Sequence, residues 1–192
     1  MRLTKIYTKI GDKGETRLAS GEKISKANQR INSYGTVDEL NAVCGMLADS
    51  LKEKEPKLFA DLEKRIHTIQ NLLFDIGGEL SFSEGKCPDY VQQIKSKHVT
   101  MLEEDMDKYN ELLEPLKNFI LPGGHPSQSL CHLARVTCRR AEREVVELAQ
   151  EESVRSEVIV FLNRLSDWFF VLCRYINKHT KTPEKLWEQT KN

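Results

Sequence analysis

The sequence predicts an all-α protein, a five-helix bundle preceded by an irregular N-terminal segment. Apolar residues recur at helical spacing in five long stretches, and short loops separate these stretches. Alternating, strand-like patterns are almost absent, and residues 1–35 are the only part without helical periodicity. The 192 residues can bury a sizeable core within one domain. We therefore expect a single domain over residues 1–192.

The first helix is predicted to begin near Thr36, which forms a capping-box pattern with Glu39 three residues later. The second helix is predicted to begin at Pro56, because the fixed φ of proline suits a first helical turn, and to end at Gly77-Gly78. The apolar stripes of the two helices predict these core residues: Leu40, Val43, Cys44, Leu47, Leu51, Leu58, Leu62, Ile66, Ile69, Leu72, Leu73 and Ile76.

The remaining helices are predicted over about residues 88–113, from the turn at 122–124 through Arg143 and beyond, and over about 154–178. On the fifth helix, Asn163, Asp167 and Arg174 align on the side opposite its apolar stripe. The tail that follows, TPEKLWEQTKN, is predicted to dock as a final helical turn or to stay loose.

The fourth helix carries a polar face that we call the arginine face, formed by Arg135, Arg139, Glu142 and Arg143 with Arg140 at its margin. One interpretation is a solvated face on which Arg139 and Glu142 pair. The other is an anion clamp, because guanidinium groups match phosphate geometry and stay charged. The helical pattern alone favours the solvated face. The apolar side opposite comprises Leu130, Ala134, Cys138, Ala141, Val145 and Leu148.

The N-terminal segment TKIGDKGET, residues 8–16, also has two interpretations. Its Asp-Lys-Gly sequence is typical of a surface turn. Alternatively, Gly11 and Gly14 allow backbone N–H groups to close on an anion. The side chains that would assist are Thr8, Lys9, Lys13, Thr16 and Lys26.

Composition excludes several classes of protein. The 29 basic residues balance the 29 acidic ones, so no net field attracts nucleic acid or an anionic membrane. The five cysteines are odd in number and form no C-x-x-C, which indicates reduced thiols in a cytosol-like compartment. The N-terminus lacks the apolar core of a signal peptide, and no apolar run is long enough to span a bilayer. We expect a cytoplasmic protein.

Common catalytic patterns are missing as well. The sequence contains neither the Glu-x-x-His pairs of di-iron bundles nor H-E-x-x-H or G-x-S-x-G. No metal site formed by protein side chains is therefore expected. What remains is a set of arginines, amides, carboxylates and a glycine loop. Such residues bind and orient phosphates, and the difficult chemistry would belong to a cofactor.

Five motifs in series resemble the PduO-type ATP:cob(I)alamin adenosyltransferases. They are KIYTKIGDKGETRL, SYGTVDELNA, FILPGG, ARVTCRRAERE and FLNRLSDWFFVLCRYIN, and they cover about residues 5–45 and 119–178. The resemblance implies a five-helix bundle that forms a homotrimer with active sites between adjacent subunits. It implies that ATP, with Mg²⁺, donates its 5′-deoxyadenosyl group to cob(I)alamin, yielding adenosylcobalamin and triphosphate.

The resemblance also implies roles for individual residues. Asp38 and Arg135 match a pair that joins subunits beside the corrin, and Phe119 matches an apolar residue that displaces the lower axial ligand of cobalt. Arg139 is expected to stabilise the departing triphosphate. Asp167 belongs to a matching motif, without a clear contact. The expected ATP site comprises Thr8, Lys9, Ile10, Gly11, Thr16, Arg17 and Lys26, with Arg139, Arg140, Ala141, Glu142, Arg143 and Asn163 from the neighbouring subunit.

The sequence departs from the family pattern at Ile10, where a polar residue is more common, and at His125, where a small polar residue is common. These departures concern the details of ATP affinity. A reductase and an adenosylcobalamin-dependent enzyme are expected partners. The alternatives that stay open are a catalytically inactive trimeric carrier of ATP or cobalamin, and a structural bundle whose polar face is merely solvated.

Overall fold

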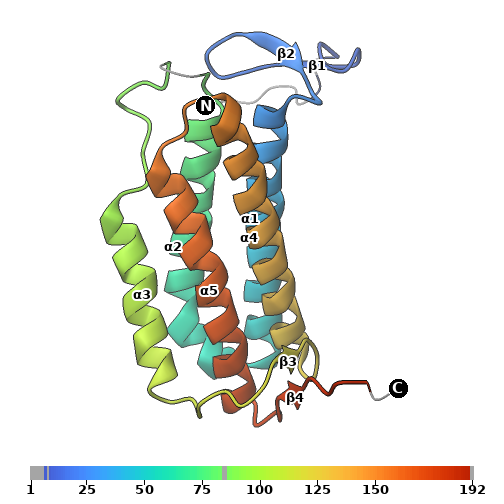
Figure 1. The fold of residues 1–192 in the computed structure, drawn as a ribbon, viewed down its shortest axis with the longest axis vertical. Coiled ribbons are helices and arrows are strands. Elements are labelled where there is room, and N and C mark those ends of the chain that lie inside the picture. Colours follow the sequence, from blue (N-terminus) through green and yellow to red (C-terminus); the bar gives the residue numbers. More distant parts are fainter. Residues whose placement is uncertain (1–6, 8, 84–85, 191–192) are drawn as a thin grey trace.

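The computed structural model describes residues 7, 9–83 and 86–190 and contains five long helices (Figure 1). The predicted all-α, five-helix bundle is confirmed. The helices are α1 (Gln29–Lys54), α2 (Pro56–Leu80), α3 (Ser96–Asn110), α4 (Pro126–Glu151) and α5 (Ser156–His179). None of the helices in these ranges is long and apolar enough to cross a membrane.

The helices run alternately up and down the long axis of the molecule (Figure 1). α1 packs against α2 and α4, α4 packs against α5, and α3 packs against the outer side of α5. A single residue, Glu55, separates α1 from α2, so these two helices must turn back on each other. The start of α1 and the end of α4 lie at one end of the bundle (Figure 1). The start of α4 and the end of α5 lie at the other end.

The core lies where the predicted apolar stripes meet. Of the twelve residues predicted from the first two stripes, all but Val43 are buried, and Val43 packs against the core from its edge. The largest side chains with almost no exposure are Trp168, Phe161 and Phe169, all on α5, which lies between α4 and α3. Helical periodicity thus identified the core correctly, because a packed helix buries one continuous stripe.

The start of the first helix was predicted wrongly. α1 begins at Gln29, and its N-cap is Asn28, whose side-chain oxygen accepts a hydrogen bond from Arg30 N at 2.8 Å. Thr36 lies inside the helix, where its hydroxyl donates to Asn32 O at 2.8 Å. The extra turns are stabilised by tertiary contacts, because Arg30 and Ser33 are buried against other elements.

The third helix is shorter than predicted, spanning Ser96–Asn110 rather than residues 88–113. Before it, the Ile94 carbonyl accepts a hydrogen bond from Arg155 at 2.8 Å, and Ile94 is fully buried. After it, Pro115 disfavours helical geometry at Glu114, and the Glu114 carbonyl accepts from Arg174 at 2.7 Å. Distant arginines therefore hold both flanking segments in non-helical conformations.

The described residues include four short strands, which form two antiparallel pairs. β1 (Glu15–Arg17) pairs with β2 (Lys23–Ser25) at the end of the bundle where α1 begins. β3 (Ile120–Leu121) pairs with β4 (Lys185–Leu186) at the opposite end. Two residues of the tail therefore pair as a strand and do not form the predicted helical turn. No local sequence pattern could have predicted the pairing of β3 with β4, because the two strands lie far apart in the sequence.

Arg30 joins three elements near the β1–β2 end of the bundle. The side chain is 3% exposed, and its Nη2 lies 2.5 Å from the Glu152 carboxylate. Its Nη1 donates to Leu80 O at 2.9 Å and to Phe82 O at 2.7 Å. The guanidinium thus fastens the start of α1 to the ends of α2 and α4.

We expect Arg30→Met to destabilise the protein by about 3 kcal/mol, because the carbonyls and carboxylate around a buried cation lose their partner. Thermal unfolding followed by circular dichroism should show a Tm about 10 °C lower. Lys54→Met is the matched control, since its pair with Glu53 is exposed, and it should shift the Tm by less than about 2 °C. Equal shifts in the two variants would contradict this role for Arg30.

Candidate active site

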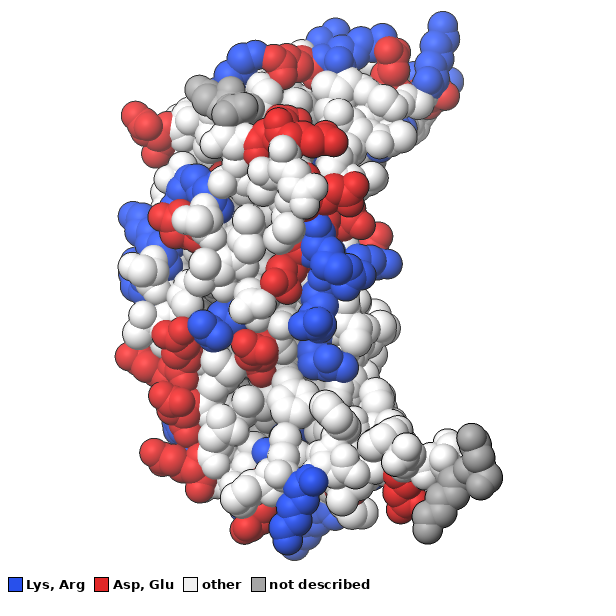
Figure 2. Space-filling model, in the orientation of Figure 1, with Lys and Arg blue, Asp and Glu red and all other residues white. Residues whose placement is uncertain are grey.

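The arginine face of α4 points away from the core of its own bundle, as predicted. Arg139, Arg140 and Arg143 are exposed, whereas Ala134, Cys138 and Ala141 on the other side are fully buried. Figure 2 shows basic side chains gathered in a band over α4, with acidic side chains beside it. Local charge clustering therefore exists even though the net charge of the chain is zero.

Four predicted residues line one depression of about 560 Å³ between α4 and α5: Arg139, Glu142, Arg143 and Asn163. Asn163 Nδ2 donates to the Glu142 carboxylate at 2.9 Å, which ties the two helices together at this point. Arg143 Nη1 donates to Arg139 O at 3.3 Å. Among the residues that the structure describes, none pairs with the Arg139 guanidinium. That group is therefore available to an anion.

Two other predicted residues lie apart from this depression. Arg140 forms an exposed ion pair with Glu39 on α1, and such exposed pairs contribute little to stability. The Ala141 side chain is fully buried and packs in the core, as its position on the apolar side of the helix predicted, so it does not line this depression. The pairing of Arg139 with Glu142 in the solvated-face interpretation is likewise not observed, because Glu142 accepts from Asn163.

The N-terminal residues line a second depression of about 480 Å³. Its lining includes Lys9, Ile10, Gly11, Thr16, Arg17 and Lys26. Thr8 lies outside the described residues. A Cβ on Gly11 would lie 3.0 Å from Lys26 Nζ and 3.2 Å from Glu15 O, so a larger residue here would crowd Lys26 and the Glu15 carbonyl. Gly14 has a φ of +81°, which favours glycine and turns the chain into β1.

Asp38 lines a third depression of about 350 Å³, between α1 and α2. Arg17 lines both this depression and the N-terminal one, so the two adjoin. Asp38 is exposed, and Arg135 is half-buried on α4 with its Nε donating to His132 Nδ1 at 3.4 Å. The two residues of the predicted pair do not contact each other within the chain.

Phe119 lies at the opposite end of the molecule, next to β3, and is 78% exposed. The Trp187 ring packs edge-on against it with the ring centres 6.5 Å apart, and Trp187 N donates to Phe119 O at 2.7 Å. Sequence reasoning missed Trp187. The available signal was a lone tryptophan in an otherwise polar tail, which is too weak to specify a partner.

Two residues predicted on the polar side of α5 have structural contacts. Arg174 is buried, and its Nε donates to the Glu184 carboxylate at 2.7 Å, so it holds the tail rather than facing outward. Asp167 is exposed and pairs with Arg164 at 3.3 Å. At the start of α4, His125 Nδ1 accepts from Ser127 N at 3.3 Å, so this departure from the family pattern supplies a helix cap.

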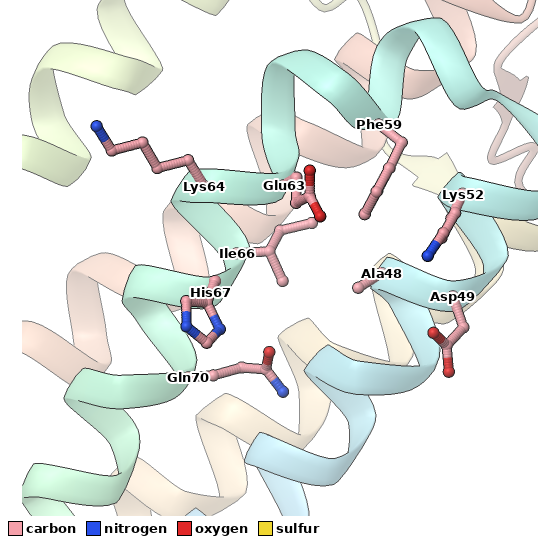
Figure 3. A pocket seen from close by; sticks show the side chains of 9 residues that line it. All are labelled: Ala48, Asp49, Lys52, Phe59, Glu63, Lys64, Ile66, His67 and Gln70. Carbon is pink, nitrogen blue, oxygen red and sulfur yellow. The ribbon is translucent and has the colours of Figure 1, made fainter.

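A depression of about 510 Å³ between α1 and α2 contains none of the predicted site residues (Figure 3). Figure 3 shows Ala48, Phe59 and Ile66 directed into it, with Asp49 and Glu63 near its rim. No arginine lines this depression, so it lacks the guanidinium groups that match phosphate geometry.

The cysteines do not supply a reactive thiolate on the arginine face. Cys138 is fully buried behind it, and burial raises the pKa of its thiol well above the usual range. Burial likewise raises the pKa of Cys44 to about 12. Nucleophilic cysteine chemistry requires the thiolate.

No group of His, Cys, Asp or Glu within residues 7, 9–83 and 86–190 could hold a metal ion.

The fold and these depressions define a class: a helical bundle that presents an arginine without a partner among the described residues, together with a glycine loop, a combination suited to a polyphosphate. A family model described as "Cobalamin adenosyltransferase" matches residues 6–176, and the chain belongs to that family. It is 42% identical to a corrinoid adenosyltransferase of Bacillus subtilis, over 97% of this chain and 93% of the relative. It is 38% identical to the corrinoid adenosyltransferase MMAB of Homo sapiens, over 97% of this chain and 74% of the relative.

Solved structures agree with the family. A variant of the PduO-type ATP:corrinoid adenosyltransferase from Lactobacillus reuteri, complexed with cobalamin and ATP, superposes with a TM-score of 0.88 at 37% identity. The match covers 96% of this chain and 100% of that chain. The resemblance inferred from the five motifs is therefore confirmed.

Proposed function

We propose that this protein transfers the 5′-deoxyadenosyl group of ATP to the cobalt of cob(I)alamin. The cobalt electron pair forms the bond to C5′ of the ribose while the C5′–O bond breaks, and triphosphate leaves with the electrons of that bond. The family membership supports this reaction, as does the relative that binds both cobalamin and ATP. The observation that carries the proposal for this chain is the unpaired Arg139 in the depression shared with Glu142, Arg143 and Asn163.

The residues bind and orient the reactants rather than activate a nucleophile. Cob(I)alamin is strongly nucleophilic by itself, so no general base is needed, and holding C5′ over cobalt contributes several kcal/mol. Arg139, Arg143 and Lys26 would stabilise charge on the departing triphosphate. Mg²⁺ accompanies ATP in this proposal and neutralises part of the triphosphate charge.

The active form is proposed to be a homotrimer with active sites between adjacent subunits. The arginine depression and the N-terminal depression share no lining residue within one chain. Each carries part of the ATP site implied by the motifs, and an interface that joins the two halves would complete it. Asp38 of one subunit would then pair with Arg135 of the next, and residues 1–192 would act as one domain. Light scattering should give about three times the chain mass of 22.1 kDa.

Phe119 is proposed to lie against the lower face of the corrin and to displace the axial ligand. Its exposed ring, backed by Trp187, offers an apolar surface at one end of the bundle. We place the protein in the cytoplasm, where a reductase supplies cob(I)alamin and an adenosylcobalamin-dependent enzyme receives the product.

An anaerobic assay tests the function directly. The purified protein is mixed with cob(I)alamin, ATP and Mg²⁺, and the loss of the cob(I)alamin spectrum is followed together with the formation of adenosylcobalamin. We expect turnover and stoichiometric triphosphate. ATP binding by calorimetry without turnover would instead identify an inactive carrier, and absence of binding would leave the arginine face as a solvated surface.

A further inference from the structure

His132 on α4 is a buried polar residue that the proposed mechanism does not use. The side chain is 3% exposed, yet its two ring nitrogens have different surroundings. Nδ1 accepts a hydrogen bond from Arg135 Nε at 3.4 Å. Nε2 is fully buried and has no hydrogen-bond partner among the described residues. Buried polar side chains usually have partners, so this arrangement requires an explanation.

The hydrogen bond to Arg135 determines the tautomer of His132. A guanidinium only donates, so Nδ1 must carry the lone pair and Nε2 must carry the proton. An imidazolium would direct an N–H group at the arginine, so the ring must be neutral. The proton on Nε2 then lies in the core, where no described residue accepts it.

The bond between His132 and Arg135 does not hold the bundle together. Both residues lie on α4, three positions apart, so the bond cannot fasten one helix to another. Its effect is to fix the orientation of Arg135, which is half-buried at the margin of the core. Because Nε is bound, the two terminal nitrogens of Arg135 stay directed away from His132. Within the described part of the chain neither terminal nitrogen has a partner.

We infer that His132 is a positioning residue that holds the Arg135 guanidinium ready for a carboxylate of the neighbouring subunit, namely its Asp38. The inference rests on the proposed function, since it assumes the subunit pairing beside the corrin. It adds that the pair depends on a buried imidazole whose Nδ1 accepts a hydrogen bond from Arg135 Nε. The Arg135 side chain would then already hold the rotamer that the pair requires, which lowers the conformational-entropy cost of forming the pair.

The test compares His132→Phe, which keeps a ring without an acceptor, with His132→Asn, whose side-chain oxygen can replace Nδ1. We expect His132→Phe to lower kcat/KM for cob(I)alamin about tenfold, mainly through a higher KM, and to leave the KM for ATP nearly unchanged. His132→Asn should recover most of the loss. Thr137→Val, a buried polar change on the same helix, is the matched control and should change neither parameter.

A double-mutant cycle separates positioning from a structural role. In an Arg135→Ala background, His132→Phe should change kcat/KM by less than about twofold, because the residue it positions is gone. An equal loss in both backgrounds, or an equal loss in Thr137→Val, would overturn the inference. If the unmodified protein shows no turnover, the proposed function fails instead.

One measurement does not depend on activity. The ¹⁵N chemical shifts of the His132 imidazole should show a protonated Nε2 and an unprotonated Nδ1, and Arg135→Ala should release the ring to a mixture of tautomers. A protonated Nδ1 in the unmodified protein would refute the arrangement whatever the assay shows.

Discussion

Arg139→Ala is expected to reduce turnover about a hundredfold or more while the protein stays folded. The Arg139 guanidinium lies in the depression between α4 and α5 and has no protein partner among the described residues. Removing one group that stabilises developing charge costs about 3–4 kcal/mol in comparable sites. The fold should tolerate the change, because Arg139 is exposed and alanine is the best helix former.

The measurement is kcat and kcat/KM in the anaerobic assay, with circular dichroism and light scattering to verify fold and assembly. Arg139→Lys should be intermediate, since an ammonium keeps the charge but loses the two-pronged geometry of guanidinium. Lys108→Ala, which removes an exposed cation from α3, should leave turnover within about twofold. Full activity of a correctly folded Arg139→Ala protein would refute the anion clamp.

Phe119→Ala is expected to reduce turnover more when the substrate is supplied as cob(II)alamin than when it is supplied as cob(I)alamin. With cob(II)alamin and a reductant, turnover should fall about ten- to hundredfold, since burying a phenylalanine ring contributes about 1.5–3 kcal/mol. With cob(I)alamin prepared in advance, the loss should be several times smaller. An axial base that donates to cobalt makes the reduction difficult, and the apolar ring removes that donor.

The Phe119→Ala substitution should not disturb the fold. Phe119 is 78% exposed and packs edge-on against Trp187, so its removal takes no volume from the core. Tyr90→Ala removes an aromatic ring of similar exposure, 79%, and should affect neither assay. Equal losses with both substrates would count against displacement of the axial ligand by Phe119.

Most of the fold could be predicted from local sequence. Amphipathic helices show their buried stripe at a period of 3.6 residues, so Leu40 to Leu51 on α1 and Leu58 to Ile76 on α2 were recognisable without a structure. The helix ends were less predictable. Asn28, not Thr36, caps α1, because the burial of Arg30 against Glu152 stabilises the additional turns. That contact joins residues more than a hundred positions apart.

For the candidate site, too, one part could be predicted from the sequence and another part required the structure. Five motifs identified the residues and the family, since the order and spacing of short motifs are carried by the sequence itself. Which of those residues lie together required the structure. Arg139, Arg143 and Asn163 share one depression, Arg140 pairs with Glu39, and Ala141 turns inward.

The sequence by itself determined that the fold is a helical bundle, the core stripes, the arginine face and the family, because each depends on residues close together along the chain. Only the tertiary structure decided that Arg174 holds the tail through Glu184, that Trp187 backs Phe119 and that His132 binds Arg135 from within the core. A side chain's partner is set by the packing of whole helices against one another. The arginine face was visible in the sequence, but its unpaired Arg139 and its buried support are properties of the folded bundle.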